Sequence, residues 1–141
     1  MSYRYLDHGA DIGIEAKDET LEGVFIDSAR AVFGLMTDVE EITTDQSIKI
    51  ELKESELEDL FYEWLSELIS LGNMNRQVYG KFEGLTIEKA EEEYRLEATA
   101  LGERIDPEKH ELGTEVKALT YLGLELSQVD GGWKGRFVLD V

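Results

Sequence analysis

Residues 7–11, Asp-His-Gly-Ala-Asp, bring two carboxylates and an imidazole together around a glycine that allows the backbone to turn sharply. Oxygen-rich groups of this kind suit Ca²⁺ or Mg²⁺, whereas a zinc site usually recruits several histidines. This chain has only two histidines, His8 and His110. Aspartates in turns also hydrogen-bond their own backbone, so the spacing alone fits a structural turn as well as a cation site.

A second polar group lies at the C-terminal end of the sequence. The alternation of residues 133–141 predicts a strand whose apolar side faces the core and whose other side carries Asp140. The side chain of Asp140 and the terminal carboxylate of Val141 could complete a cation site with Asp11. The alternative is that Val141 is the last core residue of the strand and Asp140 is its solvated neighbour.

A third polar group follows the Asp106-Pro107 turn. We expect a strand over residues 114–126 that carries Lys117 on the same face as Glu115, Leu119 and Tyr121. A buried lysine needs a partner, which favours an ion pair with Glu115 or with a carboxylate across the sheet over a catalytic role.

Composition excludes several other kinds of site. The chain has no cysteine, hence no disulfide, thiolate zinc site or cysteine nucleophile, and it has no phosphate-binding glycine loop or nucleophile elbow. Its formal net charge of −18 disfavours direct, tight nucleic-acid binding and leaves basic protein surfaces or divalent cations as partners. A solvated acidic surface explains the same charge. The N-terminal segment lacks a signal peptide and no segment is apolar enough to span a membrane, so we expect a cytoplasmic protein.

The helices and strands that must position these groups are predicted to form a single α+β domain over residues 1–141. Apolar periodicity predicts helices over residues 20–36 and 55–72, the second with a Ser55/Glu58 capping box and an end at Gly72. The expected strands are residues 3–7, 12–17, 47–52, 78–82, 85–90, 94–101, 114–126 and 133–141. The later strands lack the crossover helices that parallel pairing requires, so the sheet should be mainly antiparallel. We expect two helices packed on one sheet or on a pair of small sheets.

The same residues resemble the archease family over nearly the whole chain. The resemblance runs through Asp7-His8-Gly9-Ala10-Asp11-Ile12, residues 60–68, residues 106–110, residues 114–121 and Asp140-Val141. It implies an accessory protein rather than an enzyme. The family activates RNA-splicing ligases of the RtcB type in tRNA splicing, by promoting guanylylation of the ligase and multiple turnover. It is also linked to a chaperone role for a tRNA cytosine-5 methyltransferase.

Carried over residue by residue, the resemblance implies a metal site at Asp11, Asp140 and the carboxylate of Val141. The cation is most often Ca²⁺, with Mg²⁺ or Mn²⁺ as alternatives. Asp7 and His8 border that site, and Lys117 matches a position tied to activity.

The chain departs from the family pattern at Gly9, where the family usually has threonine, and at Leu122, where a histidine is common. A metal or proton-handling role at these two positions is therefore not expected here. A further alternative is a metal-dependent phosphoester hydrolase that uses Asp7, His8, Asp11 and Lys117, with His8 as the general base, although no nucleophile is indicated.

Overall fold

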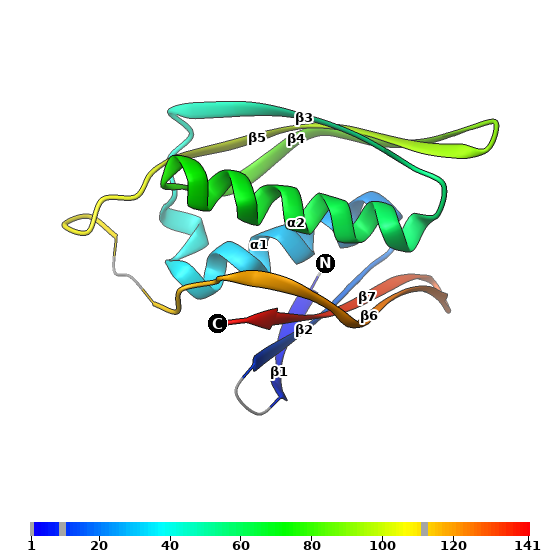
Figure 1. Ribbon diagram of the computed structural model, residues 1–141, viewed down its shortest axis with the longest axis horizontal. Coiled ribbons are helices and arrows are strands. Elements are labelled where there is room, and N and C mark those ends of the chain that lie inside the picture. Colours follow the sequence, from blue (N-terminus) through cyan, green and yellow to red (C-terminus); the bar gives the residue numbers. More distant parts are fainter. Residues whose placement is uncertain (1, 9–10, 111–112) are drawn as a thin grey trace.

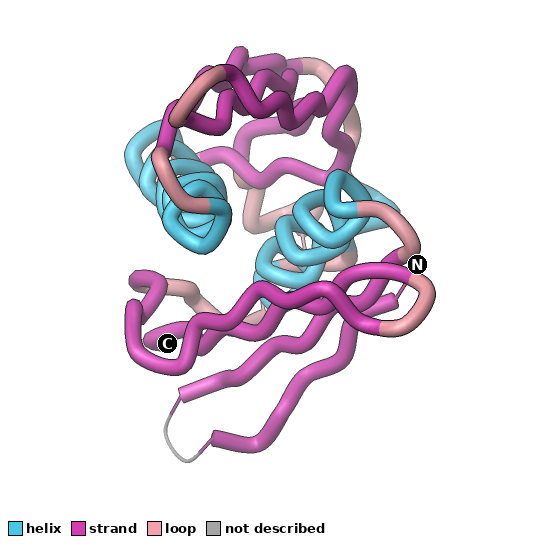
Figure 2. Tube along the Cα trace, turned by 90° about the vertical axis from the view of Figure 1, so that its right-hand side faces the viewer, coloured by secondary structure: helices cyan, strands magenta, loops and turns pink. Residues whose placement is uncertain are grey.

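Two antiparallel sheets enclose a pair of helices in the computed structural model, which describes residues 2–8, 11–110 and 113–141 without the side chains of Asp7 and His8. The four-stranded sheet has the order β1 (Ser2–His8), β2 (Asp11–Asp18), β7 (Gly132–Asp140) and β6 (Ala118–Val129). The three-stranded sheet has the order β3 (Gln46–Glu54), β5 (Glu93–Arg104) and β4 (Gln77–Ala90). The predicted α+β class is confirmed, with the helices between two sheets (Figures 1 and 2).

Helix α1 (Leu21–Met36) begins where its periodicity predicts, and the Thr20 hydroxyl caps it by accepting a hydrogen bond from the Gly23 amide at 3.0 Å. A short 3₁₀ turn, η1 (Val39–Glu41), follows it. Helix α2 (Leu57–Asn75) differs from its prediction at both ends. Its N-cap is Glu56, which makes no side-chain capping bond, so the predicted capping box is wrong.

The predicted end of α2 at Gly72 is also wrong, because the helix continues to Asn75 and closes at Arg76 in the left-handed conformation, with φ of 53°. Gly72 serves packing instead. A Cβ at this position would lie 2.9 Å from the Gln77 carbonyl oxygen and 3.4 Å from the Phe33 ring. The glycine therefore allows α2 to approach α1 and the following strand closely.

The core lies between the layers and is centred on aromatic side chains from both helices. Trp64 is fully buried and its indole N–H donates to the Phe25 carbonyl oxygen at 2.9 Å. The Trp64 ring also packs against Phe25 and Phe82, with ring centroids 6.5 and 5.7 Å apart. One side chain thus connects α2 to α1 and to β4. No helix in the described part of the chain is long and apolar enough to cross a bilayer.

Two strands depart from their predicted bounds. The segments 78–82 and 85–90 form one continuous strand, β4, whose pairing with β5 shifts register at Gly80 and again between Glu83 and Thr86. Strand β6 begins only at Ala118, so residues 114–117 precede the sheet and the predicted strand start at Thr114 is wrong. The first hairpin is longer than expected, since its ladder continues to the pair His8 and Asp11.

Candidate functional site

Strand register places the two predicted metal-binding aspartates on neighbouring strands. Ile12 of β2 and Leu139 of β7 form the last pair of the ladder, and Asp11 and Asp140 are the residues directly beyond that pair, one on each strand. Leu139 is fully buried in the core, and alternation therefore turns Asp11 and Asp140 toward the uncovered outer face of the sheet. Directly opposite antiparallel residues have Cβ atoms about 4.5–5.5 Å apart, close enough for two carboxylates to share one cation.

The hairpin of β1 and β2 extends this row by one residue. His8 pairs with Asp11 and Ala118 pairs with Asp140, so these four residues form a row at the same end of the sheet. Asp7 pairs with Ile12 and occupies the alternate position. Gly9 lies outside the described residues, as do the side chains of Asp7 and His8.

Lys117 reaches this row through its backbone. Its amide donates to the Asp140 carbonyl oxygen at 2.9 Å, immediately before β6 begins. The side chain is exposed, and Lys117 does not share a strand face with Glu115, Leu119 and Tyr121 as predicted. The alternation fails because Val116, which is buried, lies only three residues before the buried Leu119.

The charges on the outer face divide into two groups. Four residues along β2 from Asp11 and on the same face, the buried carboxylate of Glu15 is surrounded by cations: Arg4 at 3.0 Å, Arg136 at 3.8 Å and Lys17 at 3.9 Å. By contrast, no lysine or arginine among the described side chains forms an ion pair with Asp11 or Asp140. Neighbouring carboxylates without a counter-charge repel each other and favour a bound cation.

Two aspartates alone supply fewer oxygen donors than a hard cation takes. Among the described side chains, no three histidine, cysteine or acidic groups converge on one point. Asp11 and Asp140 supply two carboxylates, and Val141, half-buried just beyond β7, follows Asp140 directly. These are oxygen donors of the kind that Ca²⁺, Mg²⁺ and Mn²⁺ bind.

The segment that leads to Lys117 is anchored to the rest of the fold at both ends. At its start, the Ile105 amide donates to the Arg76 carbonyl oxygen at 2.8 Å. Farther along, the Gly113 and Thr114 amides donate to the carbonyl oxygens of Met36 and Leu35, each at 2.8 Å. These contacts attach the segment that precedes Lys117 to the C-terminal ends of α1 and α2.

A buried carboxylate, Glu103, holds the middle of this segment, and sequence analysis did not single it out. It accepts hydrogen bonds from the Lys109 ammonium at 2.6 Å and from the Thr43 amide at 2.7 Å. The ring of His110 accepts the Asp106 amide at Nδ1, and its Nε2 lies 3.2 Å from Glu103. Burial alone would raise the pKa of Glu103, but the bonds from Lys109, Thr43 and His110 outweigh it and hold the pKa at about 2.

We expect Glu103→Gln to lower the free energy of unfolding at neutral pH by about 2 kcal/mol, because charge-assisted hydrogen bonds are lost. A carboxyl whose folded pKa is depressed stabilises the fold above its unfolded pKa and loses this effect as the pH falls toward the folded value. The difference between variant and wild type should therefore shrink from pH 4.5 toward about 2. Urea unfolding at pH 7 and near pH 3 measures this difference in the free energy of unfolding. The substitution Glu108→Gln, at an exposed residue, is the control. Equal stability of Glu103→Gln and wild type at pH 7 would remove Glu103 as an anchor.

Comparison with known proteins decides the family. The model of the Archease protein family matches residues 3–141. The chain belongs to the archease family. Among its relatives, Protein archease of Methanosarcina mazei is 41% identical over 139 residues, covering 99% of this chain and 95% of the relative. Protein archease of Thermococcus kodakarensis is 38% identical over 140 residues, covering 99% and 98%.

Solved structures show the same family fold. The solution structure of Methanobacterium thermoautotrophicum protein 1598 is 33% identical, covers 99% of this chain and 98% of its own, and superposes with a TM-score of 0.86. The crystal structure of a Thermotoga maritima archease, described as a possible chaperone, is 23% identical and covers 96% and 94%, with a TM-score of 0.60. The second likeness concerns the fold alone.

Proposed function

We propose that this archease-family chain is an accessory protein of an RtcB-type RNA-splicing ligase, whose guanylylation and multiple turnover it promotes in tRNA splicing. Family membership supports this proposal. The observation that carries it to specific residues is the strand register, which brings Asp11 of β2 and Asp140 of β7 together just beyond the pair Ile12 and Leu139, without a basic partner among the described side chains.

Asp11, Asp140 and the carboxylate of Val141 would hold the divalent cation, Ca²⁺ or alternatively Mg²⁺ or Mn²⁺. When bound, the cation supplies a fixed positive charge that attracts further oxygen ligands. The sheet does the positioning: β2 and β7 hold the two aspartates in register, and the Lys117 amide holds the Asp140 backbone from the other side. Lys117 leaves its exposed ammonium beside this row, where it is available to a partner.

Net charge supports a protein partner that handles RNA over direct RNA binding. A chain of formal charge −18 repels phosphates, whereas a basic ligase surface attracts it. Such attraction speeds association more than it increases affinity, and salt weakens it.

Guanylylation of the cognate ligase under multiple-turnover conditions tests the proposal. The wild-type chain, added at a small fraction of the ligase concentration, is expected to raise the rate of repeated guanylylation and RNA joining. The association rate constant with the ligase should fall as salt rises. No acceleration by the wild-type chain would contradict the ligase role.

The chaperone role for a tRNA cytosine-5 methyltransferase makes a different prediction. It requires a lasting stoichiometric complex with the methyltransferase and suppression of its aggregation, measured by light scattering. Those two results without any effect on the ligase would favour this second function.

A further inference from the structure

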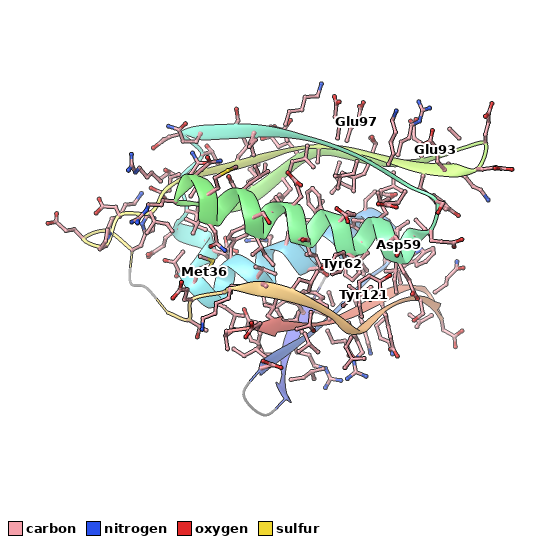
Figure 3. The ribbon with its side chains drawn as sticks, viewed as in Figure 1. Met36, Asp59, Tyr62, Glu93, Glu97 and Tyr121 are labelled. Atoms are coloured by element: carbon pink, nitrogen blue, oxygen red, sulfur yellow. The ribbon has the colours of Figure 1, made fainter. Side chains whose placement is uncertain are left out.

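An aromatic and aliphatic patch is exposed where α2 meets the edge of the four-stranded sheet. Leu122 of β6 is 87% exposed and its neighbour Tyr121 is 63% exposed, the highest values on this strand among the large apolar residues. Tyr62 of α2 lies against Tyr121, with ring centroids 4.9 Å apart (Figure 3). Large apolar side chains exposed at neighbouring positions of an edge strand are typical of surfaces that bind another protein.

Tyr121 is already held in one orientation. Its hydroxyl donates to Asp59 Oδ1 at 2.7 Å, and the Tyr62 ring packs against it at an interplanar angle of 55°. The bond to Asp59 raises the pKa of Tyr121, so the phenol remains a protonated donor. A tyrosine that is ordered before binding loses little conformational entropy on binding, which makes it a suitable anchor.

The surroundings of the patch are acidic, and neither α2 nor β6 contributes a positive charge. Helix α2 and strand β6 contain neither lysine nor arginine, while Glu58, Asp59 and Glu63 lie on the α2 side. Burial, together with the charges of Glu54, Glu67 and Asp59, raises the pKa of Glu63. This local excess of negative charge attracts cations, and the faces of Tyr62 and Tyr121 attract them as well.

We propose that Tyr62, Tyr121 and Leu122, bordered by Glu58 and Asp59, form a docking surface for a positively charged protein segment that carries an apolar side chain. It is called here the α2–β6 patch. The identity of the partner as the ligase rests on the proposed function, but the chemistry of the docked segment does not.

Two other occupants fit the patch less well. A second copy of this chain would bring two acidic surfaces together, and their charges repel. An added strand would need a regular edge, but the pairing of β6 with β7 breaks between Thr120 and Glu125, where Gly123 has φ of 87°. Because this edge is irregular, we expect the docked segment to be recognised by side chains and not by an added strand.

The patch lies next to the candidate metal row along the same strand. Ala118 pairs with Asp140, and Tyr121 follows only three residues later. Residues three apart on a strand are about 10 Å apart. Because Tyr121 packs against α2 while Asp140 faces the outer side of the sheet, a partner seated on the α2–β6 patch would have to pass around the β6 edge to contact Asp140 and Lys117.

The first experiment uses a defined probe, a short peptide of alternating lysine and leucine, titrated into the ¹⁵N-labelled protein at about 0.15 M salt, where the screening length is about 8 Å. We expect the largest amide shifts at Tyr62, Tyr121 and Leu122, and none with a peptide of alternating glutamate and leucine. The size of the complex in sedimentation shows whether the protein remains monomeric. No binding, shifts centred on the outer sheet faces, or self-association through the patch would overturn the proposal.

Variants separate the patch from general acidity. Tyr121→Ser/Leu122→Ser and Glu58→Lys should each weaken peptide binding by about tenfold, the loss expected for an interface anchor. The matched control Glu97→Lys makes the same charge change on an exposed residue of β5 in the opposite sheet (Figure 3), and it should leave binding unchanged. Equal weakening by Glu58→Lys and Glu97→Lys would reduce the effect to net charge and overturn the proposal.

A second arm uses the ligase and distinguishes this proposal from the proposed function. If wild type binds and stimulates the ligase, Tyr121→Ser/Leu122→Ser should weaken the complex while leaving Ca²⁺ binding intact. Unchanged ligase affinity in that variant would exclude the patch as the ligase-docking surface. If wild type fails to bind the ligase, the proposed function fails, and the peptide titration still decides the chemistry of the patch.

Discussion

Asp140→Asn is expected to reduce stimulation of the ligase strongly under multiple-turnover conditions. The substitution keeps the size of the side chain but replaces one of two facing carboxylates with a neutral amide. Removing a residue that hydrogen-bonds to a metal ligand typically lowers metal affinity about 10–100-fold. The loss of a ligand itself should lower the metal affinity at least as much. Stimulation should fall by at least about tenfold at limiting Ca²⁺, together with direct Ca²⁺ binding measured by calorimetry.

Thermal unfolding supplies a readout that does not need the ligase. A ligand that binds only the folded state stabilises it by about 2.7 kcal/mol at a hundred times its dissociation constant. Ca²⁺ should therefore raise the melting temperature of wild type and of the control Asp130→Asn, whose exposed side chain lies at the β6–β7 turn. It should not raise that of Asp140→Asn or Asp11→Asn, nor that of a chain lacking Val141. A normal Ca²⁺ response in all of these variants would refute the site while leaving the partnership open.

Trp64→Phe is expected to produce the largest loss of stability among single substitutions that keep an aromatic ring. The phenyl ring leaves part of a fully buried volume empty and leaves the Phe25 carbonyl oxygen without its indole donor. The cavity and the lost hydrogen bond together should lower the free energy of unfolding by about 2–4 kcal/mol. Urea unfolding followed by far-UV circular dichroism measures this loss.

Trp133→Phe is the matched control for this substitution. Trp133, near the start of β7, is only partly buried, so its replacement should lower the free energy of unfolding by less than about 1 kcal/mol. Equal losses in both variants would show that Trp64 does not have a special role between the layers.

Local periodicity was sufficient for the elements that place the candidate metal row. The spacing in α1 and the alternation from Trp133 to Leu139 predicted the sides of these elements that face the core, although Val138, on the other side of β7, is buried as well. The position of Asp140 on the outer face follows from that alternation. The position of Asp140 beside Asp11 could not be predicted from alternation, because the pairing of β2 with β7 joins residues from opposite ends of the sequence.

The errors arose where tertiary contacts override a local pattern. Residues 114–117 resemble a strand, yet the Thr114 amide donates to the Leu35 carbonyl oxygen at the end of α1 instead of to a neighbouring strand. Glu103 reads as an ordinary strand residue, because its partner Thr43 lies 60 positions away in the sequence. No spacing rule indicates a contact of that range, and the same holds for the bond between Tyr121 and Asp59.

The central place of β7 in the four-stranded sheet has a consequence for biosynthesis. β7 lies between β2 and β6, although it is made after both of them. Until it emerges from the ribosome, the β1–β2 hairpin has an open edge and β6 has no partner in the sheet. The nascent chain can thus assemble this layer, and the row of residues from His8 to Ala118, only after β7 has been made. A prematurely terminated product would expose two strand edges and be prone to aggregation.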